Sequence, residues 1–143
     1  MALNNLYVLE PLIIERLASQ VLGLKTVASG SILAGVQDIA KYCPAAFVLA
    51  GPSEPAGDTQ KGAVQVIKQM WQVTVAVANI RDPNDINTTA MQAGPLQLGV
   101  INALKGWLPP TLTHALRFDG CGLPYFEVGY GEFPSFFTVQ MPL

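Results

Sequence analysis

Between residues 71 and 77, tryptophan or valine occupies every second position, and the residues between them are glutamine, threonine and alanine. Successive side chains of a β-strand point to opposite faces of a sheet, so this alternation puts the large apolar side chains on one face. Residues 64–70 are also typical of a strand. The sequence therefore predicts a strand with one face turned towards a hydrophobic core, and we expect Trp71 to lie in that core.

A second strand is predicted at residues 45–50, a compact apolar run that follows Pro44. Residues 51–58 come next, and they are rich in glycine, proline and aspartate, a composition typical of a loop. Two strands joined through such a loop form a hairpin. We expect a long β-hairpin whose tip is this loop and projects from the body of the protein.

An amphipathic helix is predicted near the N-terminus, at residues 10–22, with Gly23 as its stop. After this helix we expect a short strand at 25–29, a turn at 30–35 and one or two helical turns at 36–42. The helix prediction rests on apolar residues that recur at helical spacing, namely Leu9, Leu12, Ile13, Leu17 and Val21.

A second helix is predicted to begin at a cap formed by Thr88 or Thr89, to run to about Lys105 and to end at Gly106. Pro95 lies inside this span, so we expect either a kink or a later start. The side chains expected to share one apolar face are Met91, Leu98, Ile101 and Leu104.

The C-terminal third contains three predicted strands, at 114–118, 124–129 and 136–141, separated by glycines. The order of elements along the chain is helix, strands, helix, strands. This order favours an α+β fold in which two helices pack on a mainly antiparallel β-sheet. A chain of 143 residues is of the usual size for one domain, and we expect one at 1–143.

Charged residues are scarce in this chain. They make up 13% of the sequence, against about a quarter in ordinary soluble domains, while 50% of the residues are apolar. One interpretation is that part of the surface is covered by other subunits. The alternative is a monomer with a polar but uncharged coat. The net charge of −2 and the lack of a basic block argue against specific binding of nucleic acid.

The residues that bind metals are few. His114 is the one histidine, Cys43 and Cys121 have no close spacing, and a zinc site needs about four ligands. We expect two free, buried thiols in a reducing cytosol, and a structural His114 within a strand. No stretch approaches the roughly 20 apolar residues of a membrane span, and no secretion signal begins the sequence.

The sequence offers no catalytic constellation. Glu127 and Glu132 are close in sequence, but nothing forces their carboxylates together, and Asp82 and Asp85 flank a turn that aspartate favours. The sequence also lacks a nucleophile elbow, a phosphate-binding loop and a dinucleotide-binding pattern. We therefore expect neither an enzyme nor a cofactor.

An aromatic cluster lies near the C-terminus, and its side chains serve either the core or a subunit interface. Phe136 and Phe137 are adjacent, so a strand would direct them to opposite faces. One of the two must then meet something other than the core of the sheet. The cluster comprises Tyr125, Phe126, Tyr130, Phe133, Phe136 and Phe137.

Taken in order, several segments resemble the phage tail terminator proteins. No single segment is exclusive to that family, but their order and spacing together are more specific, and they cover most of the chain. The segments are Ile14-Glu15-Arg16-Leu17, Pro44-Ala45-Ala46-Phe47-Val48-Leu49, Gln69-x-Trp71-x-Val73-x-Val75-x-Val77, Gly94-x-Leu96 leading to Ala103-Leu104-x-Gly106-Trp107-x-Pro109, and residues 133–141.

The resemblance implies a structural virion protein, assembled in the host cytoplasm, at the head-proximal end of the phage tail. It implies a homo-oligomeric ring, commonly a hexamer, that stops polymerisation of the tail tube and offers a docking face for the neck. The implied partners are further copies of the chain, the tail tube protein, a neck or head-completion protein and, in some tails, the sheath. DNA would pass through the ring without specific binding. The family has no catalytic residues to transfer.

Three regions are the candidate contacts: the hairpin tip, the turn at 81–87 and the aromatic C-terminal strands. An alternative function is that of another head–tail joining protein or a tail tube component, and a more distant one is a small binding domain or hydrolase. The candidate contact residues are Gly51, Pro52, Glu54, Asp58, Lys61, Arg81, Asp82, Asp85, Tyr130, Phe133 and Phe136.

Overall fold

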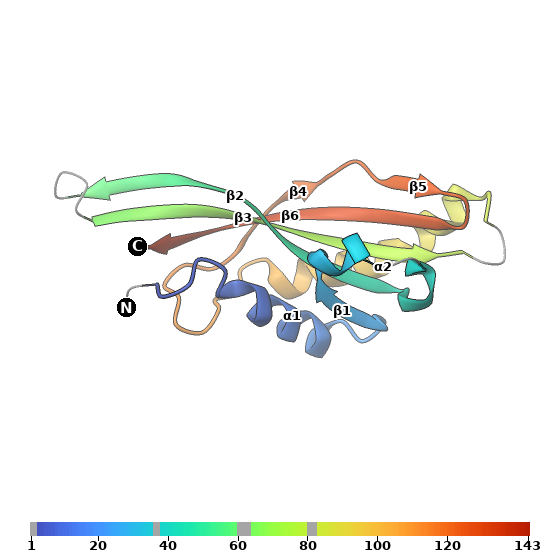
Figure 1. Ribbon diagram of the computed structural model, residues 1–143, viewed down its shortest axis with the longest axis horizontal. Helices are drawn as coiled ribbons and strands as arrows, with labels where there is room; N and C mark the ends of the chain where they lie inside the picture. The colour runs from blue at the N-terminus through green and yellow to red at the C-terminus, as the bar shows by residue number, and fades with distance from the viewer. Residues whose placement is uncertain (1–2, 36–37, 60–63, 80–82) are drawn as a thin grey trace.

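A computed structural model describes residues 3–35, 38–59, 64–79 and 83–143 of the chain (Figure 1). Two α-helices and a six-stranded, mostly antiparallel sheet lie within these ranges, which confirms the predicted α+β fold. The helices are α1 (Leu9–Gln20) and α2 (Ile86–Leu104). The strands are β1 (Thr26–Ser29), β2 (Ala45–Thr59), β3 (Val64–Ala78), β4 (Arg117–Cys121), β5 (Tyr125–Glu127) and β6 (Tyr130–Pro142).

Strand β3 is the centre of the sheet. It pairs antiparallel with β2 on one side and with β6 on the other, and Trp71 lies opposite Phe137 in the second pair. Strand β1 adds to β2 in parallel, whereas β4 and β5 both add antiparallel to β6. The long β2–β3 hairpin is confirmed, and its far end extends beyond the helices at the left of Figure 1.

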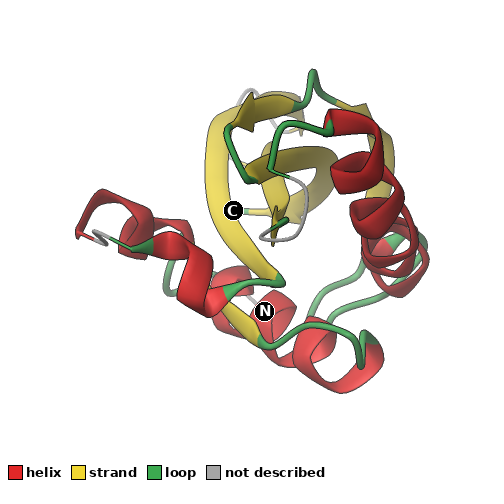
Figure 2. Ribbon diagram, turned by 90° about the vertical axis from the view of Figure 1, so that its right-hand side faces the viewer, coloured by secondary structure: helices red, strands yellow, loops and turns green. Residues whose placement is uncertain are grey.

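The two helices cover one face of the sheet, which we call the covered face (Figure 2). Trp71 is fully buried there, as expected. The N-terminal helix also forms as predicted, and Leu9, Ile13 and Leu17 of α1 are fully buried against the sheet. Arg16 ties the two helices together, because its Nε donates a 3.0 Å hydrogen bond to the carbonyl of Ala103.

The opposite face, which we call the open face, is covered by neither of the two described α-helices. A small cluster of Ala45, Phe47, Ala76 and Tyr130 lies at one end of it, packed against Ile39 and Cys43. These last two residues belong to the connection between β1 and β2, which contains two 3₁₀ helices, η1 (Gly30–Gly35) and η2 (Ile39–Tyr42). The sequence had indicated a turn at 30–35 and helical turns at 36–42, of which residues 36 and 37 lie outside the described part.

The prediction of a loop at residues 51–58 is wrong, because β2 continues through this segment to Thr59. Strand β1 pairs with β2 only as far as Val48, so among the described residues no strand lies on the outer edge beyond that point. Proline is tolerated at such an edge because no ladder hydrogen bond is lost there. Register shifts between Ala50 and Ser53, and between Pro55 and Gly57, absorb the irregular residues.

The start of α2 differs from the prediction, and of the two outcomes expected at Pro95 the later start is excluded. The cap is Asp85, whose side chain accepts from the backbone N–H of Thr88, so the helix begins before Thr88. The helix also runs through Pro95, which is exposed, so water can satisfy the carbonyl of Met91 that loses its partner. Its end at Gly106, with a φ of +72°, is as predicted.

The C-terminal strands differ mainly in their bounds. Strand β6 begins at Tyr130 and is longer than the predicted 136–141, because it pairs with β3 along nearly its whole length. Strand β4 begins at Arg117, so His114 is not in a strand; it is exposed, and its Nδ1 lies 3.1 Å from the hydroxyl of Thr113.

Candidate interaction surfaces

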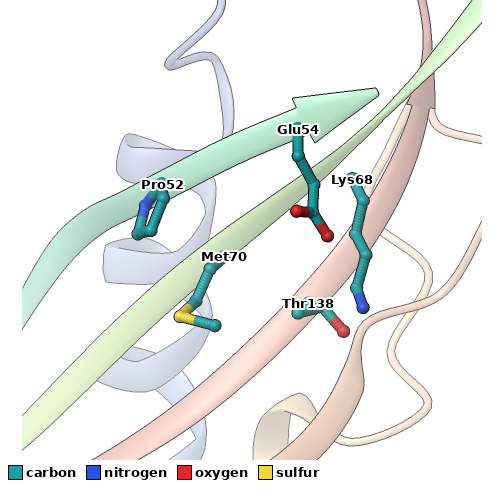
Figure 3. Close-up of a pocket in the computed structure, with 5 residues that line it drawn as sticks. All are labelled: Pro52, Glu54, Lys68, Met70 and Thr138. Carbon is teal, nitrogen blue, oxygen red and sulfur yellow. The ribbon is translucent and has the colours of Figure 1, made fainter. Parts of the chain in front are cut away.

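The outer part of the hairpin places three predicted contact residues, Gly51, Pro52 and Glu54, on β2. Pro52 and Glu54 line a cavity of about 110 Å³ on the open face, together with Lys68, Met70 and Thr138. Figure 3 shows these side chains arranged around the same hollow from three neighbouring strands.

Lys68 and Thr138 also line a second cavity, of about 290 Å³. Its other walls include His114, Arg117 and Gln140. The two neighbouring cavities are lined by residues from β2 to β4. We call them together the open-face groove.

The open-face groove carries charges of both signs. The Nε of Arg117 lies 2.8 Å from Oδ1 of Asp119 in an exposed ion pair. Partial burial opposes ionisation of Asp119, but hydrogen bonds from Thr138 and Arg117 and the charges of Arg117 and Lys68 outweigh it and lower the pKa of that carboxyl. The groove therefore has mixed rather than strongly basic character, which gives it no special affinity for phosphate.

The remaining predicted contacts of the hairpin and the turn are less informative. Asp58 lies opposite Gln65 near the end of the β2–β3 ladder. Lys61, Arg81 and Asp82 lie outside the described residues. Asp85 accepts hydrogen bonds from the backbone N–H and the hydroxyl of Thr88, which lower the pKa of its carboxyl, so its oxygens are engaged in capping α2.

The aromatic residues divide between the two faces. Phe137 is fully buried on the covered face and Phe136 is half-buried on the open face, which confirms that the pair points in opposite directions. Tyr130 and Phe133 are only 8% and 5% exposed. Burial and the neighbouring carboxylate of Glu132, which accepts a 3.0 Å hydrogen bond from the phenol, raise the pKa of Tyr130. An interface role for these residues stays a prediction.

The prediction of two buried thiols is half wrong. Cys43 is half-buried, and desolvation, with the charge of Glu132, raises the pKa of its thiol to about 11. Cys121 is exposed because it lies on the edge strand β4. Both are free cysteines.

Sequence reasoning missed the surface with the clearest apolar character, which lies on the outer side of α2. Met91 is 71% exposed and Leu98 is 57% exposed, whereas Leu104, which was expected to share one face with them, is fully buried. Pro95 is exposed beside Met91 and Leu98, at helical spacing. The sign that could have revealed this surface is that no residue of this 19-residue helix is charged.

The described residues include no group of three or more His, Cys, Asp or Glu side chains placed to hold a metal ion. Every buried side-chain nitrogen or oxygen among them has a hydrogen-bond partner. None of the described helices has the length and apolar character that crossing a membrane requires.

The surfaces described above are sheet edges, shallow grooves and an apolar helix side, which are features found in protein contacts. No curated protein matches this sequence. A family model described as phage tail terminator protein matches residues 3–143, nearly the whole chain. The resemblance noted in the sequence is thereby confirmed, and the chain belongs to the phage tail terminator family, whose members are structural proteins of the phage tail.

Proposed function

We propose that copies of this chain form a closed ring at the head-proximal end of the tail tube, where the ring stops tube growth and provides the docking face for the neck. The observation that carries this proposal is the match of residues 3–143 to the tail terminator family. Six copies per ring is the proposed number.

The accessible surface of the chain supports assembly. It amounts to 8138 Å², whereas a compact monomer of 15.3 kDa exposes about 7,100 Å². The excess is about 1,000 Å², slightly more than one partner contributes to a standard protein interface. Much of it arises because the β2–β3 hairpin extends beyond the helices (Figure 1). Such a surface is of the size that contacts with neighbouring subunits would cover.

A ring of such copies is compatible with passage of DNA. A chain of this length has a radius of gyration of about 14–15 Å, so six globules leave a central hole of roughly one subunit's diameter. The net charge of −2 supplies no basic lining that would hold the phosphates.

The terminating activity requires two unlike faces. One face of the ring must bind the last ring of the tube. The other face must not bind a further tube ring but must bind the neck protein. The open-face groove and the outer hairpin are the proposed contacts to tube and neck. The residues of the hairpin in these contacts would be Gly51, Pro52, Glu54, Asp58 and Lys61.

The proposal is tested by electron microscopy of tails from a phage that lacks this protein. Tubes that grow beyond the normal length and carry no heads are the expected result, because nothing would stop polymerisation. Tubes of normal length without heads would instead point to a joining protein. Particles that look normal would exclude both functions.

A further inference from the structure

The hairpin end of the sheet has two edges without a neighbouring strand among the described residues. Strand β1 pairs with β2 only as far as Val48, and β4 pairs with β6 only as far as Thr138. Beyond these points the sheet consists of β2, β3 and β6 alone, at the left of Figure 1. An unpaired edge presents backbone N–H and C=O groups to which a strand of another chain can add.

The backbone groups that point outward at these edges follow from the hydrogen bonding of β3. The N–H of Leu143 donates a 2.9 Å hydrogen bond to the carbonyl of Gln65, which lies directly opposite in the register of β3 and β6. In an antiparallel pair, residues that exchange such bonds alternate with residues that do not. Odd-numbered residues of β3 therefore direct their backbone groups to β6, and even-numbered residues direct theirs to β2.

A proline occupies an outward-pointing position on each edge. On β2, Ser53 and Pro55 lie opposite odd-numbered residues of β3, so their backbone groups point away from it. On β6, Gln140 and Pro142 lie opposite even-numbered residues, so theirs point away as well. Proline has no backbone N–H, so Pro55 and Pro142 each remove a donor that an added strand would need. Register shifts on either side of Ser53–Pro55 keep the regular part of the β2 edge short.

The strand that such edges would otherwise accept belongs to a second copy. The β2 edge of one copy and the β6 edge of another lie at the same end of the same sheet, so pairing them would continue the sheet from copy to copy. That contact joins two different surfaces, and unless its rotation closes a ring, it produces an open-ended filament.

We infer that Pro55 and Pro142 close the two free edges of the hairpin end to strands of further copies, and that they thereby keep the assembly of this chain finite. Partners at this end of the molecule are then bound through side chains of the two sheet faces. The inference goes beyond the proposed function and does not depend on it.

Restoring the two N–H groups tests the inference. The double variant Pro55→Thr, Pro142→Thr supplies a donor at both edges. The matched control, Ser53→Thr with Gln140→Thr, places the same residue at outward positions that already have an N–H, so it adds strand propensity but no donor. Sedimentation velocity of the purified chains over a range of concentrations measures the mass of the assemblies.

The double variant should form open-ended species whose mass keeps rising with concentration. Its association constant for these species should exceed that of the natural chain by about tenfold or more, because each contact regains two hydrogen-bond donors. The control should match the natural chain. A folded double variant with the mass distribution of the control would overturn the inference.

Two further measurements keep the test decisive. Pro142 is half-buried, so its replacement can cost stability, whereas Pro55 is exposed. If the melting temperature of the double variant falls, Pro55→Thr alone should still associate more strongly than Ser53→Thr alone, and equal association would contradict the inference. In the assembled material, the new amide at position 55 should be protected from hydrogen exchange, and free exchange there would show that the edge is not the contact.

The outcomes separate the inference from the proposed function. If phage that lack the chain have normal tails, the proposed function fails, and the result at the hairpin edges is unaffected. If their tubes overgrow but the double variant assembles like the control, the prolines do not limit assembly and the terminator function stands.

Discussion

The indole Nε1 of Trp71 donates a 2.9 Å hydrogen bond to Oε1 of Gln69, two residues earlier on the same face of β3. The amide nitrogen of that Gln69 side chain donates in turn, over 3.0 Å, to the carbonyl of Leu6. Both side chains are fully buried. A buried glutamine thereby satisfies the indole and attaches the segment before α1 to the centre of the sheet.

Removing either side chain of this pair should cost stability. Gln69→Leu leaves the indole N–H without an acceptor in the core, and Trp71→Phe leaves a glutamine oxygen without a donor, so each loses about 1–3 kcal/mol through the unpaired group alone. In the double variant both polar groups are gone, and its loss should be smaller than the sum by about 1 kcal/mol. Urea unfolding of all four chains measures this coupling, and strict additivity would contradict it.

Gly131 sets the spacing between β6 and α2. A Cβ at this position would lie 2.9 Å from Cγ2 of Thr89 and 3.0 Å from the ring of Phe133. Gly131→Ala should therefore lower the free energy of unfolding by about 1–3 kcal/mol. Gly94→Ala is the control, because nothing lies within 4 Å of its added methyl group on the exposed side of α2. In the isolated chain it should raise stability by up to about 1 kcal/mol.

The cap of α2 makes stability depend on pH. The hydroxyl and backbone N–H of Thr88, at 2.6 and 3.1 Å, lower the pKa of Asp85 in the folded state. The carboxylate therefore contributes stability above its unfolded pKa of about 4, and this contribution is lost as the pH falls through the lower folded pKa. Asp85→Ala should lower the melting temperature by about 2–5 °C at pH 7. Calorimetry at pH 7 and pH 3 checks this, since an undiminished deficit at pH 3 would exclude a role for the charge.

The two cysteines should react at very different rates. With its pKa raised to about 11 by burial, the thiol of Cys43 is ionised roughly a hundredfold less at pH 8 than an ordinary cysteine. Cys121 is exposed and should be alkylated by iodoacetamide first. Mass spectrometry of the Cys121→Ser and Cys43→Ser chains separates the two rates. Comparable rates would show that Cys43 is not shielded.

The architecture of the sheet follows from alternation that is visible in the sequence. The valines of β3, the apolar spacing of α1 and the opposed pair Phe136 and Phe137 all depend on local periodicity, and the structure confirms them. The extended conformation of residues 51–58 could not be predicted in this way. Glycine and proline usually mark a loop, but here the adjacent β3 pairs with the segment and imposes extended backbone on it.

The candidate contacts were harder to predict than the fold. The spacing of the apolar residues of α2 predicted one face for Met91, Leu98, Ile101 and Leu104, but Leu104 is fully buried with Ala93 and Val100, whereas Met91 and Leu98 are exposed. Periodicity alone cannot distinguish a face that meets the core of its own chain from one that meets another chain. The burial of Tyr130 and Phe133 likewise could not be predicted, because the strand expected at 136–141 begins at Tyr130 in the structure.

Growth of tail tubes in the presence of this chain tests the central claim most directly. Purified tube protein is polymerised with increasing amounts of the chain, and tube lengths are measured by electron microscopy. The account predicts that the mean length falls as the chain is added and that each shortened tube carries a ring at one end. The contradicting result is that tubes keep their length and carry no ring even when enough of the chain is present to form at least one ring per tube.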